Sequence, residues 1–248
     1  MADAAVLKDL APTGTLRTAI NLGNGVLVQK DDASGAPSGI KGITPELAHE
    51  LGKRLGVPVE FALFDGAGKS FEALKAGDVD IAFLANEPVR AAEIEFTAPY
   101  VLIYGRYLVP ADSELKTLAD LDRPGIRIAV GPNSAYDLFL TRTLKNATIV
   151  RADKGGGRAM IDLFLRAKLE AAAGVQEPLL AYAKDHPEVR LIDEPFMQIK
   201  QSMAARKGHL AGAAYLSAFI EEMKANGFAA DALKRSGQTA AVAPPATP

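Results

Sequence analysis

The sequence contains no cysteine and no tryptophan, and only 6% of its 248 residues are aromatic. The absence of cysteine excludes disulfide frameworks, thiolate zinc sites and cysteine nucleophiles, and it is compatible with a reducing or an oxidising compartment. Apolar residues make up 48% of the chain, but no apolar run approaches the roughly 18 to 20 residues that a membrane span needs. The composition is that of a globular protein large enough to fold without covalent staples.

An excess of charge of either sign is also lacking. Lysine and arginine number 28 against 30 aspartates and glutamates, and the formal net charge is −2. Binding to nucleic acid usually needs basic residues clustered on one face, where they neutralise phosphates. We therefore expect no nucleic-acid partner.

Strand-like and helix-like runs alternate in the order β, α, β, α, β, and this order occurs twice. Such an alternation predicts parallel sheets with crossover helices. Thr44 is expected to be the N-cap of the first of these helices, with Pro45 at its first position. The predicted strands are 16–22, 59–64, 79–85, 126–130, 147–152 and 170–175, and the predicted helices are 45–55, about 70–76, 134–144 and 158–168.

The two halves resemble each other in detail, which predicts a duplicated α/β unit. Residues 16–21 (LRTAIN) and 126–131 (IRIAVG) open the halves alike, and residues 80–88 (DIAFLANEP) match 170–178 (EAAAGVQEP) at one constant offset. The matched positions include Asp80 with Glu170, Asn86 with Gln176, Glu87 with Glu177 and Pro88 with Pro178.

Two extended segments connect the halves. Residues 96–110 are too apolar and too rich in strand formers to be a loose linker, and residues 190–205 are predicted to be a second extended segment, followed by a helix at 210–227. We expect one lobe of residues 1–105 plus 196–248 and a second lobe of residues 106–195, with hinges near 104–110 and 192–198. The tail, about residues 237–248, is rich in Ala and Pro and is expected to be disordered.

Ligands of open parallel sheets bind beyond the carboxyl ends of the strands. Arg90 follows one such end, where its guanidinium could grip a carboxylate, although a surface pair with Glu87 or Glu93 is an equally good interpretation. Ser134 could cap a helix whose first N–H groups receive an anion. The candidate ligand-binding residues are Asn21, Asn24, Ala85, Asn86, Glu87, Arg90, Asn133, Ser134, Gln176 and Glu177.

The motifs LRTAI, GITPELAHELGKRLGVPVEF, ALKAGDVDIAF, VRAAEIEFTAPY and IRIAVGPNSAYDLF resemble the bacterial solute-binding proteins of family 3, the polar amino-acid receptors of ABC importers. The similarity runs from about residue 14 to 235. It implies an α/β Venus-flytrap fold of the type II periplasmic-binding-protein class, with two lobes, two hinge strands and one small ligand. The resemblance assigns the ligand's α-carboxylate to Arg90 and to the backbone N–H groups of the Asn133–Ala135 turn.

The sequence departs from this family where the ligand's ammonium is held. An aspartate is usual at the end of the second lobe's strand, but Val175 or Gln176 stands there, with Glu177 beside it, and Glu87 replaces a usual threonine. If Glu177 or Glu87 takes over, the ligand is an amino acid or a close relative. Otherwise it is a carboxylate without an amino group, held by Arg90 with the amides of Asn86 and Gln176.

The resemblance predicts a monomeric, non-enzymatic receptor that delivers its ligand to the membrane subunits of an ABC importer, without a cofactor or metal. A dehydratase similar to cyclohexadienyl dehydratase, with Glu177 as general acid, is an alternative, and so is a sensor lobe. We expect a periplasmic location. The first fifteen residues show no secretory leader, so a cytoplasmic location stays open.

Overall fold

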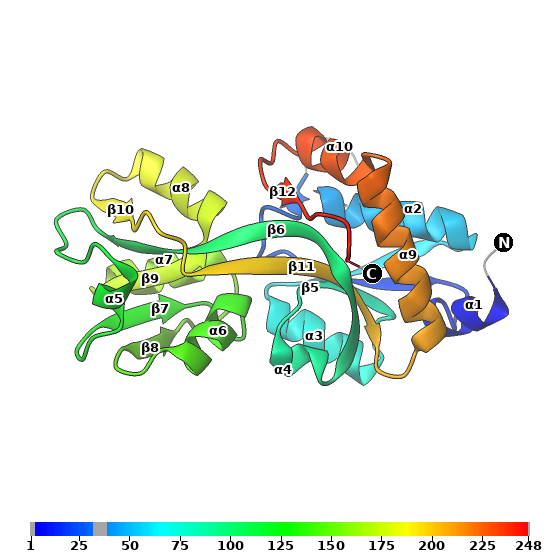
Figure 1. The fold of residues 1–248 in the computed structure, drawn as a ribbon, viewed down its shortest axis with the longest axis horizontal. Coiled ribbons are helices and arrows are strands. Elements are labelled where there is room, and N and C mark those ends of the chain that lie inside the picture. The colour runs from blue at the N-terminus through cyan, green and yellow to red at the C-terminus, as the bar shows by residue number, and fades with distance from the viewer. Residues whose placement is uncertain (1–2, 32–38, 248) are drawn as a thin grey trace. The chain divides into compact units, whose positions relative to one another are not determined.

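The computed structural model describes residues 3–31 and 39–247, which form two compact units (Figure 1). Unit 1 consists of Met1–Phe64, Lys69–Leu102 and Lys200–Pro248. Unit 2 consists of Asp65–Gly68 and Ile103–Ile199. The long strands β6 (Ile94–Pro110) and β11 (Met197–Arg206) each contribute residues to both units.

The sheet of unit 1 has the strand order β4–β1–β5–β11–β6. β1 (Leu16–Asn21) runs parallel to both β4 (Val59–Phe64) and β5 (Ile81–Ala85), and β11 is antiparallel to β5. The chain crosses from β1 to β4 and then back over β1 to β5, so right-handed crossovers place the two connecting helices on opposite faces of the sheet. The helices of this unit are α1 (Ala4–Leu10), α2 (Ile43–Leu55), α3 (Ala67–Ala76), α4 (Pro88–Ala91), α9 (Leu210–Ala225) and α10 (Phe228–Arg235), and β2 (Gln29–Lys30) and β3 (Ile40–Lys41) form a small separate ribbon.

The sheet of unit 2 repeats this connectivity in the order β6–β9–β7–β8. β7 (Arg127–Val130) is parallel to β8 (Thr148–Arg151) and to β9 (Ala171–Val175), and β9 is antiparallel to β6. Its core includes Met160, Phe164 and Leu179 from the flanking helices. The remaining elements are α5 (Leu118–Leu121), α6 (Ala135–Thr143), α7 (Gly157–Arg166), α8 (Gln176–Asp185) and β10 (Val189–Leu191), which pairs with β6.

The α/β class and the internal repeat are both confirmed by the strand registers. In unit 1, Thr18 pairs with Ile81, and in unit 2 the matched positions Ile128 and Ala171 pair. In unit 1 the first strand of the repeat, β1, lies between β4 and β5, and in unit 2 its counterpart β7 lies between β8 and β9. The strand order of each sheet therefore reverses at this first strand.

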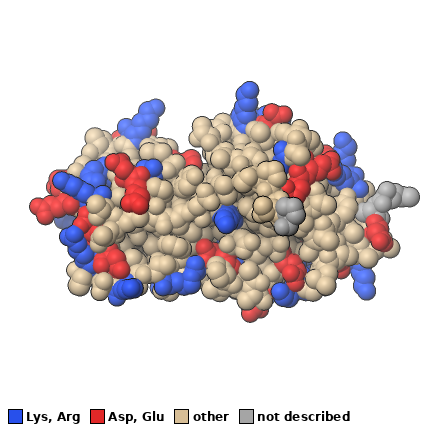
Figure 2. Space-filling model, viewed as in Figure 1, with Lys and Arg blue, Asp and Glu red and all other residues tan. Residues whose placement is uncertain are grey.

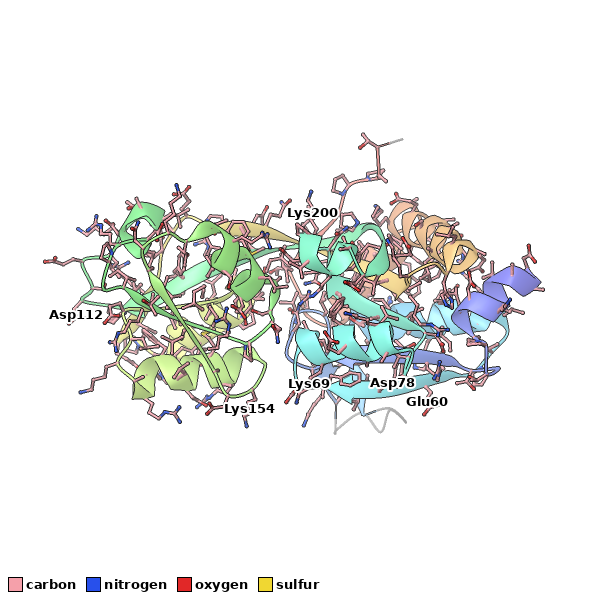
Figure 3. The ribbon with its side chains drawn as sticks, turned by 90° about the horizontal axis from the view of Figure 1, so that it is seen from below. Glu60, Lys69, Asp78, Asp112, Lys154 and Lys200 are labelled. Atoms are coloured by element: carbon pink, nitrogen blue, oxygen red, sulfur yellow. The ribbon has the colours of Figure 1, made fainter. Side chains whose placement is uncertain are left out.

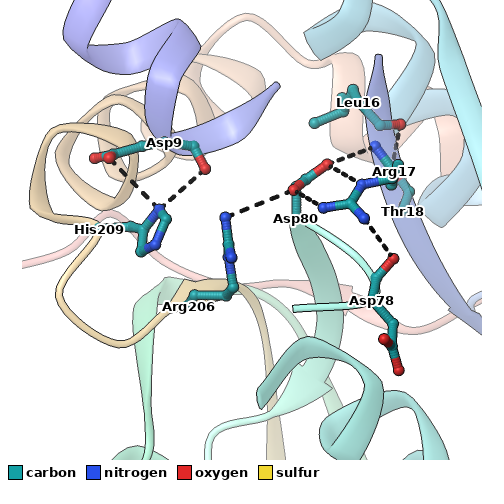
Figure 4. A network of polar contacts seen from close by, with 8 residues as sticks. All are labelled: Asp9, Leu16, Arg17, Thr18, Asp78, Asp80, Arg206 and His209. Atoms are coloured by element: carbon teal, nitrogen blue, oxygen red, sulfur yellow. Dashed lines mark hydrogen bonds and ion pairs between the residues drawn. The ribbon is translucent and has the colours of Figure 1, made fainter. Parts of the chain in front are cut away.

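An arginine–carboxylate clamp of the same geometry occurs in each unit. In unit 1, Arg17 donates from its backbone N–H (3.1 Å), Nε (2.9 Å) and Nη2 (2.6 Å) to Asp80 (Figure 4). In unit 2, Arg127 donates from the same three groups to Glu170 at 2.8, 2.9 and 2.8 Å. The hydrogen bond with Asp80 raises the pKa of Arg17, and the negative charges of Asp80, Asp78 and Glu60 raise it further (Asp78 and Glu60 are labelled in Figure 3). The clamp ties the first strand to the third in each unit.

The predicted start of the first long helix is wrong by two residues. Gly42, not Thr44, is the N-cap of α2, and the helix begins at Ile43. Gly42 has φ 126°, and a Cβ there would lie 2.4 Å from the Leu27 carbonyl oxygen, so only glycine fits this turn. The helix predicted from about residue 70 likewise begins earlier, at Ala67.

The prediction of a disordered tail is also wrong for the described residues up to 247. Residues 241–242 form β12, which pairs with Val101 and Leu102 of β6. The Ala243 N–H donates to the Tyr100 carbonyl oxygen (3.0 Å), and the buried Lys224 Nζ donates to the Pro244 carbonyl oxygen (2.9 Å). These backbone pairings hold the tail although its composition lacks the large apolar residues of a typical strand.

Acidic and basic side chains are interspersed on the face that Figure 2 shows. Within residues 3–31 and 39–247, no helix has the length and hydropathy needed to cross a membrane.

Candidate functional site

The carboxyl ends of β1 and β5 lie at one edge of the unit 1 sheet, because the two strands are parallel neighbours. Asn21 ends β1 and Ala85 ends β5. The chain then runs through Asn86 into α4, whose N-cap is Glu87. The strand-end candidates of this unit therefore share the edge at which ligands of such sheets bind.

Arg90 is the central residue of this edge. Its side chain is only 2% exposed, and its Nη1 donates to the Ala85 carbonyl oxygen (3.3 Å). Burial lowers the pKa of Arg90 to about 10, while the negative charge of Glu87, itself 5% exposed, opposes that effect. The guanidinium is therefore still a cation at neutral pH, and Glu87 acts on it from within the same short helix.

The asparagines of unit 1 shape the loops around Arg90. The side-chain oxygen of Asn21 accepts the Gly23 N–H (3.0 Å), and that of Asn24 accepts the Val26 N–H (3.3 Å). Such Asx turns leave the side-chain amide nitrogen as the group that a ligand could use. Asn86 is exposed, and its backbone N–H donates to the carbonyl oxygen of Lys200 on β11 (2.9 Å; Lys200 is labelled in Figure 3).

In unit 2, the start of α6 follows the carboxyl end of β7. Ser134 is the N-cap, and its Oγ accepts the Asp137 N–H (3.1 Å), which confirms the predicted cap. The Asp137 carboxylate accepts the N–H of Asn133 (2.8 Å), a residue with φ 53°. The Ser134 N–H donates to the Gly131 carbonyl oxygen (3.3 Å). Two N–H groups of the predicted anion turn are therefore used internally.

Asp137 does not leave a net negative charge at this helix start. Its side chain is 2% exposed and pairs with Arg151 on β8, with an Nη2 to Oδ1 distance of 2.9 Å. Beneath the same turn, burial raises the pKa of the Tyr136 hydroxyl, which packs against Gly131. The turn is thus a rigid, internally neutralised structure from which the Ala135 N–H, at the first position of the helix, points along the helix axis.

Gln176 and Glu177 begin α8 directly after β9, so these two strand-end candidates lie in the first turn of a helix. The Oε2 atom of Glu177 is buried and accepts no hydrogen bond from any described residue. Burial raises the pKa of Glu177, and its own backbone N–H and then the charge of Arg106 oppose that rise. β7 and β9 are parallel neighbours, so the starts of α6 and α8 share one edge of the sheet.

Arg106 on β6 is a charged residue of this edge that sequence reasoning missed. Its Nη1 donates to the Ile192 carbonyl oxygen (3.4 Å), and its Nε is buried and donates to no described residue. The available signal was a single arginine within the apolar run 96–110.

Among the described residues, no group of three or more histidine, aspartate or glutamate side chains is arranged to hold a metal ion.

The chain belongs to the bacterial extracellular solute-binding proteins, family 3, because the model of that family matches residues 29–238. This confirms the resemblance seen in the motifs. A search of curated protein sequences gave no match.

Solved structures with the same fold are two-lobe periplasmic binding proteins, which places the chain in the type II Venus-flytrap class. The chain is similar to the P235GK mutant of ArgBP from T. maritima (19% identity, TM-score 0.77, 94% of this chain and 99% of that chain). It is similar to the cysteine-binding protein from Campylobacter jejuni (22%, TM-score 0.77, 93% and 92%). It is also similar to the ancestral amino acid-binding protein AncCDT-1, a precursor of cyclohexadienyl dehydratase (23%, TM-score 0.75, 94% and 99%).

Proposed function

We propose that this protein is a receptor for a small α-amino acid or a close relative, which it delivers to the membrane subunits of an ABC importer. The observation that carries the proposal is Arg90, a buried cation in the short helix that follows the carboxyl end of β5. A buried guanidinium favours a carboxylate partner, which it can hold with two parallel hydrogen bonds. Family membership supports the importer as partner and a periplasmic location.

Glu177 is our candidate for the ligand's ammonium. Its Oε2 is a buried acceptor for which no described residue supplies a donor, and such a group is costly unless a ligand supplies one. Glu87 is less suited to this task, because its charge acts on Arg90. A carboxylate complements Arg90 and an ammonium complements Glu177, and an α-amino acid carries one group of each kind.

A thermal-shift screen tests the proposal. The twenty L-amino acids and a panel of mono- and dicarboxylates without amino groups are tested on wild type, Arg90→Lys and Glu177→Gln. A ligand that binds only the folded state raises the midpoint with its concentration over Kd. We expect amino acids to shift wild type and to shift both variants less. Arg158→Ala is the matched control, because the Arg158 side chain is 78% exposed and pairs with Asp162.

Shifts that appear only with the non-amino carboxylates would replace the amino acid by an organic acid. If amino acids raise the thermal midpoint of Arg90→Lys as much as that of wild type, Arg90 does not hold the ligand's carboxylate through its guanidinium.

A second candidate function is a dehydratase, which the raised pKa of Glu177 favours. A carboxyl group whose pKa is raised toward neutrality can serve as a general acid. The similarity to AncCDT-1 supports the same alternative. Incubation with a prephenate-like acid tests it: product formation that Glu177→Gln abolishes would make the protein an enzyme, whereas binding without product would support the receptor.

A further inference from the structure

Arg106 lies beside the helix start that carries Glu177. β6 and β9 are antiparallel, and Arg106 pairs with Gly174, which is three residues before Glu177. Residues paired across two strands project to the same face of a sheet. The arginine side chain therefore projects to the face on which a side chain at position 174 would stand.

The atoms that a side chain at position 174 would meet identify that face. A Cβ at Gly174 would lie 2.7 Å from the Met160 Cε and 3.5 Å from the Leu179 Cδ1. Met160 belongs to α7 and Leu179 to α8, so this face is the one on which α8 packs. Arg106 Nη1 donates to the Ile192 carbonyl oxygen, and its buried Nε has no acceptor among the described residues.

Three other charged side chains on the elements next to α8 are engaged elsewhere. β9 carries no charged residue, and the guanidinium of Arg190 on β10 donates to carbonyl oxygens of the loop after β6. Arg158 and Asp162 on α7 pair with each other (2.8 Å). Arg106 is a cation whose charge acts on the Glu177 carboxylate.

We propose that Arg106 holds Glu177 in its ionised form and thereby makes this site select a ligand with an ammonium group over a carboxylate without one. The inference rests on the proposed role of Glu177. Burial alone favours the protonated carboxyl, which would accept an ammonium poorly, and a nearby positive charge restores the carboxylate. Arg106 acts on the ligand indirectly, because it sets the charge of the Glu177 side chain that binds the ammonium.

The charge effect can be measured without a ligand. Carbon-13 NMR of the glutamate δ-carboxyl groups follows the titration of Glu177 in wild type, Arg106→Lys and Arg106→Met, and Glu177→Gln identifies its resonance. We expect wild type and Arg106→Lys to titrate alike and Arg106→Met to titrate at a higher pH. Arg106→Gln is a second charge-free variant in case circular dichroism shows that the methionine variant is unfolded. Equal midpoints in all variants would overturn the inference.

The selectivity is measured with two mixtures, one of the twenty L-amino acids and one of the corresponding α-hydroxy acids. In the charge-free variants, we expect the amino-acid mixture to raise the thermal midpoint less than in wild type as the pH falls, and the hydroxy-acid response to stay unchanged. If the titration of Glu177 shifts in the charge-free variants but their preference for amino acids over hydroxy acids stays as in wild type, the proposed selection is refuted. If the amino-acid mixture raises the thermal midpoint of Glu177→Gln as much as that of wild type, the proposed role of Glu177 in ligand binding is wrong. The NMR titration still tests separately whether the charge of Arg106 acts on Glu177.

Discussion

Replacing Arg17 by methionine is expected to cost far more stability than the same replacement at its repeat partner, Arg127. The reason is the burial of the carboxylates. The Asp80 side chain is 0% exposed, whereas that of Glu170 is 31% exposed. Without its guanidinium, Asp80 is left as a buried anion, but Glu170 can turn to water.

The magnitude follows from what remains around Asp80. Removing one partner of a buried ion pair costs about 3–5 kcal/mol. Arg206 Nη2 lies 3.9 Å from Asp80 and the backbone N–H of residue 17 is retained, so we expect the lower end of this range. For a protein of this size, about 3 kcal/mol corresponds to a fall in Tm of roughly 6–12 °C.

Urea unfolding followed by far-UV circular dichroism measures both variants under the same conditions. A further control introduces Arg17→Met into an Asp80→Asn background, where no buried anion remains and the arginine should matter much less. Equal losses of stability for Arg17→Met and Arg127→Met would refute the reasoning from burial.

Two further predictions concern the tail and Glu177. Deleting residues 239–248 removes β12 and the Pro244 acceptor of the buried Lys224, and should cost about 1–3 kcal/mol in urea unfolding; an unchanged midpoint would show that the tail adds nothing to unit 1. Burial raises the pKa of Glu177, so the folded protein binds the proton more tightly than the unfolded chain, and stability is lost as the pH rises through the folded pKa. Glu177→Gln should therefore be more stable than the ligand-free wild type at neutral pH and should lose this advantage on acidification. A lower thermal stability of Glu177→Gln than of the ligand-free wild type at neutral pH would contradict a raised pKa of Glu177.

Much of the sheet was predictable because buried strands of parallel sheets are continuous apolar runs. All five residues of β5 are buried, and so are the first four of the five residues of β9. The repeat of Asp80 and Glu170 was visible as well, because the clamps with Arg17 and Arg127 need an acid at the same place in each unit.

The missed features depend on contacts that local patterns do not encode. α4 has four residues, too few to show helical periodicity, so Arg90 was expected in a loop. The position of Arg106 beside Glu177 follows from its pairing with Gly174, and the order of the tail follows from its pairing with β6. Both pairings join segments that are far apart in the sequence.

The carboxylate grip of Arg90 is tested most directly by changing the ligand. Calorimetry compares the amino acid that gives the largest thermal shift with its α-amide, which lacks the carboxylate, on wild type and on Arg90→Lys. If Arg90 holds the carboxylate, the amide should bind wild type at least about 30-fold more weakly, since losing a charged hydrogen-bonded partner costs 2 kcal/mol or more, and Arg90→Lys should lose most of this preference. Equal affinity of wild type for the amino acid and its amide would contradict the account.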